Sequence, residues 1–269
     1  MLHEDDENVL IITTEELRRE TAQFKEWSGP ILIKFLADNE DYIYSLGSGG
    51  LVKYKERYFA ITNEHVVRSI NQNERISGIN IPYKDKNGVD KRMTIIAEAE
   101  DKDNDIAAFE ISPHSVINID NCRFLEEDQM EKNVKGYIEN TSNIVFSHGY
   151  PMYETTIDYE EKVVSMETLP YTTFVDSYDE FSDIIMLTCD LKGTSEFGNE
   201  IEISSFGGMS GSLIYGYYKE DDKTNYKCLG ILSFWEQNNN RLGVYPINDV
   251  LNFIETVFFS SGGDKRLQI

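Results

Sequence analysis

Three short segments of the sequence carry side chains that together could perform nucleophilic catalysis. His65 and Asp105 each adjoin a short apolar run, and Ser210 lies in the segment Gly207-Gly208-Met209-Ser210-Gly211. A serine hydroxyl is a weak nucleophile at neutral pH, so a hydrogen-bonded imidazole must accept its proton during attack. A carboxylate on the other ring nitrogen fixes the tautomer and stabilises the imidazolium. The residue types therefore predict a serine nucleophile, a histidine base and an aspartate that orients the base.

The small residues around Ser210 suit a binding site for a developing oxyanion. Backbone N–H groups that stabilise such a charge must approach the substrate closely, and removing one donor typically lowers the rate by about 10²–10³-fold. Gly208 and Ser210 are expected to supply these two N–H groups. Glycine suits the first position because a Cβ there could crowd the substrate or forbid the required φ.

Each of these segments has a simpler interpretation when taken alone. A histidine after an apolar strand is usually structural, and clusters of glycine and serine commonly mark turns. The alternating Asp101, Asp103 and Asp105 also suggest a calcium-binding loop. That loop would require glycine at its sixth position and glutamate at its twelfth, where this chain has Ile106 and Ser112. The calcium interpretation fails on both positions, whereas the order and spacing of the three segments favour a catalytic triad.

Four further segments follow a pattern seen around such triads. They are Thr62-Asn63-Glu64-His65-Val66-Val67, Gly149-Tyr150-Pro151, Leu229-Gly230-Ile231-Leu232-Ser233-Phe234-Trp235 and Gly243-Val244-Tyr245. With the triad order His, Asp, Ser, the chain resembles chymotrypsin-like (trypsin-like) serine proteases over residues 31–258. The residues around His65 are similar to the corresponding segment in the bacterial intracellular and heat-shock protease branch. The resemblance implies peptide-bond hydrolysis through an acyl-enzyme, with His65, Asp105 and Ser210 catalytic and Gly208 and Ser210 forming the oxyanion hole.

Several residues depart from the pattern of the digestive members of this family. Val66 replaces a disulfide cysteine, and the three cysteines Cys122, Cys189 and Cys228 match no family bridge. Met209 replaces the aspartate that pairs with a newly cut N-terminus, and methionine cannot make that ion pair. Activation by N-terminal cleavage is therefore not expected. In the bacterial branches a ligand or partner can order the oxyanion loop, which implies a possible activating partner protein here.

The resemblance also assigns positions in the primary specificity pocket. Its base would lie at Ser204, a neutral hydroxyl, which disfavours cleavage after lysine or arginine unless Glu196 or Glu202 reaches in from a loop. Gly243 would leave one wall open, and Trp235 would narrow the entrance on the other side. These features predict a small or modest apolar residue before the scissile bond.

The segment Ser233 to Trp235 is expected to bind extended substrate. Strand addition uses main-chain hydrogen bonds, so Ser233, Phe234 and Trp235 would pair with the substrate backbone. An alternative for Trp235 is that it packs on its own loop as a surface aromatic residue.

Composition limits the partners that we expect. The formal net charge of −23 argues against nucleic-acid binding, because phosphates would be repelled. No apolar run approaches the roughly 18 residues of a membrane span, and the N-terminus lacks the features of a secretory signal. With few, unpaired cysteines, the cytoplasm is the expected location.

No histidine pair or Cys-x-x-Cys has metal-ligand spacing and no phosphate-binding glycine loop occurs, so no cofactor is expected. His148 adjoins a turn and is expected to be a loop residue rather than a second base.

The pattern of apolar runs predicts one all-β domain in 269 residues. We expect two packed six-stranded antiparallel β-barrels, over residues 31–117 and 136–247, joined by a polar connector. An N-terminal extension (residues 1–30) would carry a helix over 14–27, with a capping box at Thr13 and Glu16. A short C-terminal helix would cover residues 248–258. The strands are expected at 31–35, 42–52, 58–62, 93–98 and 106–111, and then at 144–147, 162–169, 184–189, 212–217, 228–234 and 241–246.

Two functions from different classes fit this sequence. The first is a serine endopeptidase that processes a specific partner protein. The second is a latent or inactive protease-fold module, with a regulatory or binding role, whose oxyanion loop needs a partner to become ordered. An esterase would use the same acyl chemistry, but the α/β-hydrolase order is Ser, Asp, His, which differs from the order here.

Overall fold

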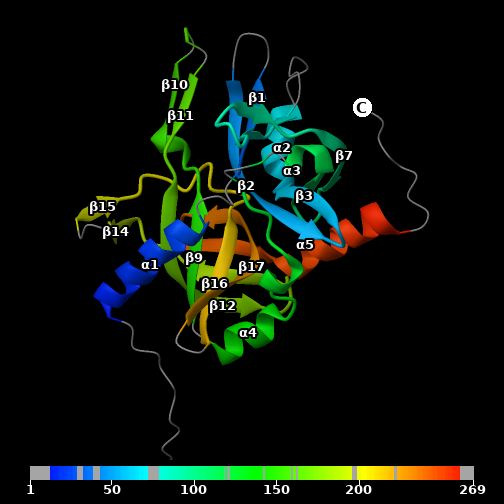
Figure 1. Ribbon diagram of the computed structural model, residues 1–269. Helices are drawn as coiled ribbons and strands as arrows, with labels where there is room; N and C mark the ends of the chain where they lie inside the picture. Colours follow the sequence, from blue (N-terminus) through cyan, green and yellow to red (C-terminus); the bar gives the residue numbers. More distant parts are fainter. Residues whose placement is uncertain are drawn as a thin grey trace, which may run out of the picture.

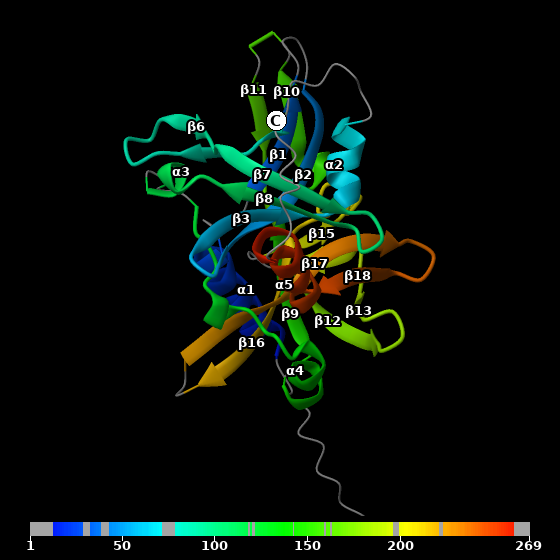
Figure 2. The same ribbon diagram turned by 90° about the vertical axis from the view of Figure 1, so that its right-hand side faces the viewer.

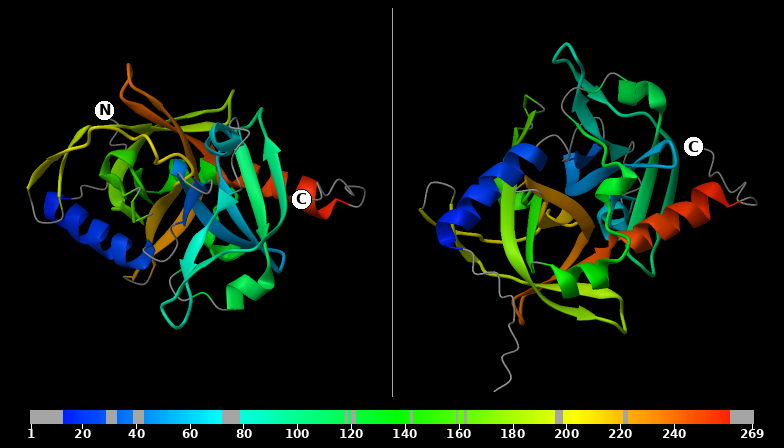
Figure 3. Two further views of the ribbon diagram at one scale, coloured as in Figure 1. Left: turned by 90° about the horizontal axis from the view of Figure 1, so that it is seen from above. Right: turned by 60° about the horizontal axis from the view of Figure 1, so that its bottom comes forward.

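The chain folds into two β-sheets that lie side by side, with helices at the periphery, as the computed structural model shows in Figure 1. From above, helices α1 (Thr14–Ser28) and α5 (Ile247–Ile254) lie on opposite sides of the molecule (Figure 3). The structure describes residues 13–28, 33–38, 43–71, 79–117, 119, 122–141, 143–158, 160–161, 163–195, 199–220 and 223–260.

The first sheet contains six strands with antiparallel neighbours. Strands β3 and β8 are neighbouring inner strands, with Ile61 opposite Ala108, and most of their residues are buried. Such apolar strands are typical of a sheet that is covered on both faces. Within the described residues no pairing joins the two outer strands, β4 and β7. In spatial order the strands are β4 (Ile79–Asn80), β1 (Ile33–Asp38), β2 (Ile43–Tyr54), β3 (Arg57–Thr62), β8 (Ile106–Ile111) and β7 (Ile95–Asp101).

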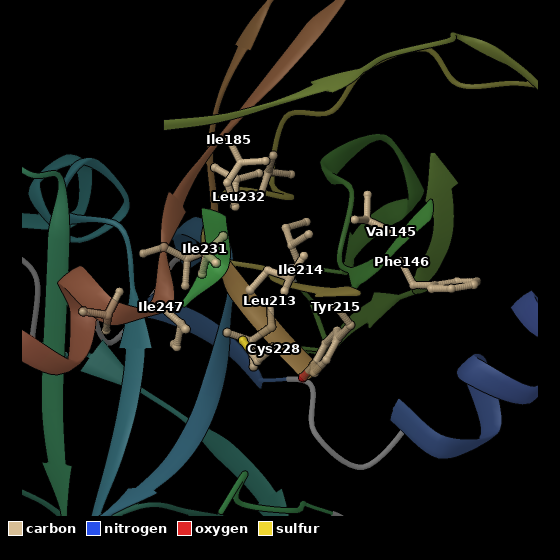
Figure 4. Packing of buried hydrophobic residues seen from close by; sticks show 14 of the residues in the cluster. Val145, Phe146, Ile185, Leu213, Ile214, Tyr215, Cys228, Ile231, Leu232 and Ile247 are labelled. Carbon is tan, nitrogen blue, oxygen red and sulfur yellow. The ribbon is translucent and has the colours of Figure 1, made fainter. Parts of the chain in front are cut away.

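The second sheet closes into a six-stranded antiparallel barrel. Its interior is filled by aliphatic and aromatic side chains, of which Figure 4 shows Val145, Ile214 and Leu232 among others. Closure leaves the barrel without free strand edges. Around the barrel the strands are β12 (Leu169–Asp179), β13 (Ile184–Thr188), β18 (Arg241–Pro246), β17 (Lys223–Glu236), β16 (Leu213–Glu220) and β9 (Ile144–Gly149).

Three two-stranded hairpins extend from these sheets. The hairpin of β10 and β11 projects from the body beside β1 (Figures 1 and 2). The hairpin of β14 and β15 directly precedes the segment that contains Ser210. Their bounds are β5 (Pro82–Lys84) and β6 (Asp90–Arg92), β10 (Thr155–Asp158) and β11 (Val163–Met166), and β14 (Lys192–Thr194) and β15 (Glu200–Glu202).

The N-terminal helix α1 packs on the closed barrel. Its first turn has the predicted capping box: Thr13 Oγ1 accepts from Glu16 N at 3.2 Å, and Glu16 Oε2 accepts from Thr13 N at 2.9 Å. Its buried face contains Glu20, Phe24 and Ser28, spaced four residues apart as one face of a helix requires. Phe24 is fully buried among aromatic rings of the barrel.

The other helices are short. In the described residues no helix is long and apolar enough to span a membrane. They are α2 (Glu64–Asn71), α3 (Pro113–Ile117), α4 (Val134–Asn140) and α5, which continues into the π-helical turn η4 (Glu255–Phe259), with the 3₁₀ turns η2 (Glu127–Gln129) and η3 (Met152–Glu154).

The predicted all-β architecture with a closed six-stranded second barrel is confirmed, but one strand assignment is wrong. The segment predicted as barrel strand 162–169 instead supplies β11 in a projecting hairpin. The barrel uses β12, which pairs with β9 and β13. Its sequence, LPYTTFVDSYD, has a proline at its second position and shows neither a continuous apolar run nor strict alternation, which are the two patterns that indicate a strand. Of the predicted extension, residues 1–12 and 29–30 lie outside the described part of the chain.

Candidate active site

His65 is positioned by the first turn of α2, which follows β3 directly. The first N–H groups of a helix lack intrahelical acceptors. Asp105 Oδ1 accepts one of them, from His65 N at 2.9 Å. The same carboxylate contacts the ring, with His65 Nδ1 at 2.8 Å from Oδ2 and 2.9 Å from Oδ1. One side chain therefore caps the helix and fixes the orientation of the imidazole.

Asp105 is held by a tight turn between β7 and β8. The Asp101 carboxylate accepts from the backbone N–H groups of Asp103 and Asn104 at 3.0 and 3.2 Å. Asp105 itself has a left-handed φ of 51°, a conformation that aspartate tolerates better than most residues. Its carbonyl oxygen accepts from Asn63 Nδ2 at 3.1 Å. The acidic run thus shapes the turn that aims Asp105 at His65.

The environment of Asp105 favours its ionised form. Burial alone would raise the pKa of this carboxyl, but hydrogen bonds from the His65 ring, the Ser233 hydroxyl and the His65 backbone outweigh it. Their net effect is a pKa below the ordinary value. An ionised carboxylate against Nδ1 is the form that stabilises an imidazolium.

Ser233 connects Asp105 to Ser210. Its Oγ donates to Asp105 Oδ2 at 2.5 Å, and its carbonyl oxygen accepts from Ser210 Oγ at 3.3 Å. In the described part of the chain, this carbonyl, and not His65, is the hydrogen-bond partner of the Ser210 hydroxyl. The sequence predicted only a main-chain role for Ser233. Its position as a polar residue in the buried apolar run of β17 was the signal for a side-chain role.

Gly208 occupies a position that excludes a side chain. Its φ is +89°, and a Cβ would lie 2.6 Å from Tyr150 O and 2.8 Å from Met152 N. The preceding carbonyl, of Gly207, accepts from Met152 N at 2.7 Å. Because the C=O and N–H of a trans peptide point in opposite directions, the Gly208 N–H faces away from Met152.

The two N–H groups predicted to bind an oxyanion are available. Among the described residues, neither Gly208 N nor Ser210 N donates to a protein acceptor. Both residues are half-buried, so a substrate or water can reach these donors. The Ser210 carbonyl, in contrast, accepts from Ser48 N at 3.1 Å. The loop therefore fixes its carbonyls on the protein and leaves two donors beside the serine.

The segment with Ser210 joins the two sheets. Ser48 belongs to β2 of the first sheet, whereas Gly211 N donates to Leu232 O of β17 at 2.8 Å. Gly211 has a φ of +87°, and a Cβ there would lie 2.2 Å from Ser48 O and 2.3 Å from Thr62 Oγ1. Glycine is thus required for this close approach. His65 and Asp105 come from the first sheet, and Ser233 of the second sheet contacts both Asp105 and Ser210 at the junction.

The predicted pocket positions are only partly as expected. Ser204 is exposed. Gly243 does not leave an open wall, because a Cβ there would lie 2.1 Å from the Phe234 ring, which faces it across the strand pair. Trp235 packs edge-to-face on Phe206, with ring centroids 5.7 Å apart, and so does not stand alone at an entrance. Glu202 lies exposed on β15. Glu196 lies outside the described residues, and the preference for a small or apolar residue stays a prediction.

His148 is not in a loop, as the sequence had suggested. It is the penultimate residue of β9 and only 3% exposed. Its Nδ1 lies 2.9 Å from Ser28 Oγ, and its Nε2 lies 2.8 Å from Thr168 Oγ1. The adjacent turn had suggested a loop, but the strand extends to Gly149.

Comparison with known proteins supports the fold. No family model matches the chain, and no curated protein matches it by sequence. The structure is similar to the serine endoprotease from Yersinia pestis, with a TM-score of 0.51 and 13% identity over 91% of this chain and 67% of that chain. It is also similar to Deg5, with a TM-score of 0.54 and 16% identity over 92% of this chain and 98% of that chain. The protein therefore has the chymotrypsin-like fold of serine endoproteases.

Proposed function

We propose that this protein is a serine endopeptidase that hydrolyses peptide bonds of protein or peptide substrates. The observation that carries the proposal is the contact of His65 Nδ1 with the Asp105 carboxylate, at 2.8 Å. Ser233 contacts both this carboxylate and the Ser210 hydroxyl, so it connects the pair to the proposed nucleophile. The free N–H groups of Gly208 and Ser210 supply the second requirement, a place for negative charge.

The proposed reaction follows from these positions. Ser210 Oγ attacks the scissile carbonyl carbon while His65 Nε2 accepts its proton, and Asp105 stabilises the imidazolium. The N–H groups of Gly208 and Ser210 donate to the tetrahedral oxyanion. His65 then protonates the leaving amine, which leaves an acyl-enzyme on Ser210. Water, deprotonated by the same histidine, hydrolyses that ester and restores the enzyme.

One contact favours a second function, a latent protease-fold module. The Ser210 hydroxyl donates to Ser233 O at 3.3 Å, so this hydroxyl must rotate away from that acceptor before it can donate to His65. Catalytic hydrogen bonds are often loose before substrate binds, so this contact is compatible with an active enzyme. If the rotation needs an activating partner protein, the isolated chain has low activity.

Labelling with a fluorophosphonate separates these functions. The reagent phosphonylates a serine only when a base accepts its proton, and mass spectrometry locates the adduct. We expect labelling at Ser210 and none in the Ser210→Ala variant, whose circular dichroism spectrum should match that of the wild type. An adduct on another serine would refute the assignment of the nucleophile.

A second comparison tests the latent function. A chain that labels only after cell extract is added is a latent protease that needs a partner. A chain that stays unlabelled in both conditions contradicts the endopeptidase proposal and favours a binding module. Digestion of casein by the same protein before it meets the reagent then distinguishes a peptidase from an esterase.

A further inference from the structure

The oxyanion loop (residues 207–209) rests on a turn formed by residues 149–152. Met152 N donates to Gly207 O at 2.7 Å. Tyr150 N donates to Ser48 Oγ at 2.9 Å, and that hydroxyl donates to Gly208 O at 2.7 Å. The carbonyls on both sides of Gly208 are thus fixed by the turn, one directly and one through Ser48. The direction of the Gly208 N–H depends on where this turn lies.

The turn begins immediately after His148, which is anchored on both sides. Its two ring nitrogens contact the hydroxyls of Ser28 and Thr168, at 2.9 and 2.8 Å. A neutral imidazole donates from one nitrogen and accepts at the other, and a hydroxyl can take either role. Burial, reinforced by the nearby charge of Lys25, lowers the pKa of His148 to about 4. The ring is therefore neutral at neutral pH and both contacts persist.

Ser28 is the last residue of α1, so one of the two anchors belongs to the N-terminal helix. The helix is fixed close to this point by Phe24, whose ring lies 5.1 Å from Phe146 and 6.3 Å from the His148 ring. Figure 4 shows Phe146 among the buried residues of the barrel. Beside α1 there is also a cavity of about 450 Å³, whose lining includes Lys25 and Thr168. The helix is thus incompletely packed along this side, and its C-terminal end provides the fixed contact to His148.

We propose that His148 is a positioning residue for peptide hydrolysis, through which the end of α1 holds the oxyanion loop in its catalytic arrangement. The connection runs from Ser28 to the His148 ring, along the chain to Tyr150 and Met152, and across to the carbonyls that flank Gly208. It includes no group of the His65–Asp105 pair. The inference rests on the proposed function, because it assigns a catalytic consequence to a structural contact.

Two variants remove the anchors singly, and a third serves as a matched control. Ser28→Ala removes the contact from α1, and Thr168→Val removes the contact on the other nitrogen. Thr172→Val makes the same chemical change four residues along, where the hydroxyl contacts Thr21 of α1 at 2.8 Å. The control loosens the helix without touching His148. None of these residues belongs to the proposed catalytic machinery.

The first readout is inactivation by a fluorophosphonate, resolved into kinact and KI. We expect kinact to fall about tenfold in Ser28→Ala and Thr168→Val, because displacing a catalytic group by about 1 Å can cost up to 10²-fold. KI and the melting temperature should stay close to those of Thr172→Val. Equal kinact in all three variants would overturn the proposal, since a merely structural contact would affect them alike.

The second readout does not need activity. In protein labelled with ¹⁵N-glycine, the Gly208 amide resonance should shift in Ser28→Ala and stay in place in Thr172→Val. The low-field proton between His65 Nδ1 and Asp105 should be unchanged in both. A wild-type chain that fails to react would count against the proposed function, whereas a Gly208 amide unaffected by Ser28→Ala would overturn this inference alone.

Discussion

Replacing Asp105 by asparagine tests the candidate site most directly. Each carboxylate oxygen has two contacts: Oδ1 lies 2.9 Å from both His65 N and Nδ1, and Oδ2 lies 2.8 Å from Nδ1 and 2.5 Å from Ser233 Oγ. The amide of asparagine must place an NH₂ group in one of these positions. The backbone N–H of His65 cannot accept a hydrogen bond, whereas the Ser233 hydroxyl can rotate and accept one. The NH₂ group is therefore expected at the Oδ2 position.

This orientation determines the size of the effect. An NH₂ group at the Oδ2 position lies about 2.8 Å from His65 Nδ1 and favours the tautomer with its proton on Nε2. That tautomer cannot accept the Ser210 proton. The corresponding change in a serine protease triad lowers kcat by about 10⁴-fold, or about 5 kcal/mol of activation free energy. Because Asn keeps the shape of Asp and still accepts from His65 N, the capping of α2 should survive.

The assay is the rate of fluorophosphonate inactivation, with Asp103→Asn as the matched control. Asp103 lies exposed in the same turn, so its replacement makes the same change of charge outside the network. We expect Asp105→Asn to react about 10⁴-fold more slowly than Asp103→Asn, with equal melting temperatures. Equal inactivation rates in the two variants would remove Asp105 from the mechanism.

Three further variants test other parts of the structure. Gly208→Ala places a Cβ 2.6 Å from Tyr150 O at a φ of +89°, so inactivation should slow by roughly 10²-fold or more; a rate near that of the wild type would exclude Gly208 N from the oxyanion hole. Ser233→Ala removes a hydrogen bond that lowers the pKa of Asp105, so the titration of the Asp105 carboxyl carbon, followed by NMR, should move to higher pH, and an unmoved titration would contradict the contact. The sign follows because the ionised carboxylate persists above its folded pKa and is lost as the pH falls through it. Phe24→Ala should lower the free energy of unfolding by about 3–5 kcal/mol in urea titration, and a change under 1 kcal/mol would show that α1 is not docked on the barrel.

The sequence predicted the fold class and most strands because their apolar runs are buried on both faces. Residues 106–111 and 58–62 are such runs, and they form the inner strands β8 and β3. The residues adjoining them, Asp105 and His65, were therefore placed correctly at the ends of neighbouring strands. Their mutual contact follows from the pairing of Thr62 with Ala107, which brings the two strand ends together.

Contacts between distant segments were beyond prediction. The side chain of Ser233 contacts Asp105, which lies 128 residues away in the sequence, and His148 contacts Ser28, which lies 120 residues away. Strand β12 was missed because Pro170 lies near its start and its polar residues stand in pairs, so the segment has neither an apolar run nor strict alternation. The Phe234 ring that covers Gly243 was missed since the register of β17 and β18 contains a bulge.

The position of Ser210 explains why two sheets are needed for one site. Its carbonyl is held by Ser48 of the first sheet, and its hydroxyl contacts Ser233 of the second. Ser233 also donates to Asp105, so the second sheet sets both the serine and the carboxylate that orients His65. A shift between the sheets would therefore move Ser210 and Asp105 together, whereas in our proposal a shift of α1 acts on residues 207–209 through His148. Conditions that loosen the junction should remove serine reactivity before either sheet unfolds, because the site depends on contacts that neither sheet makes by itself.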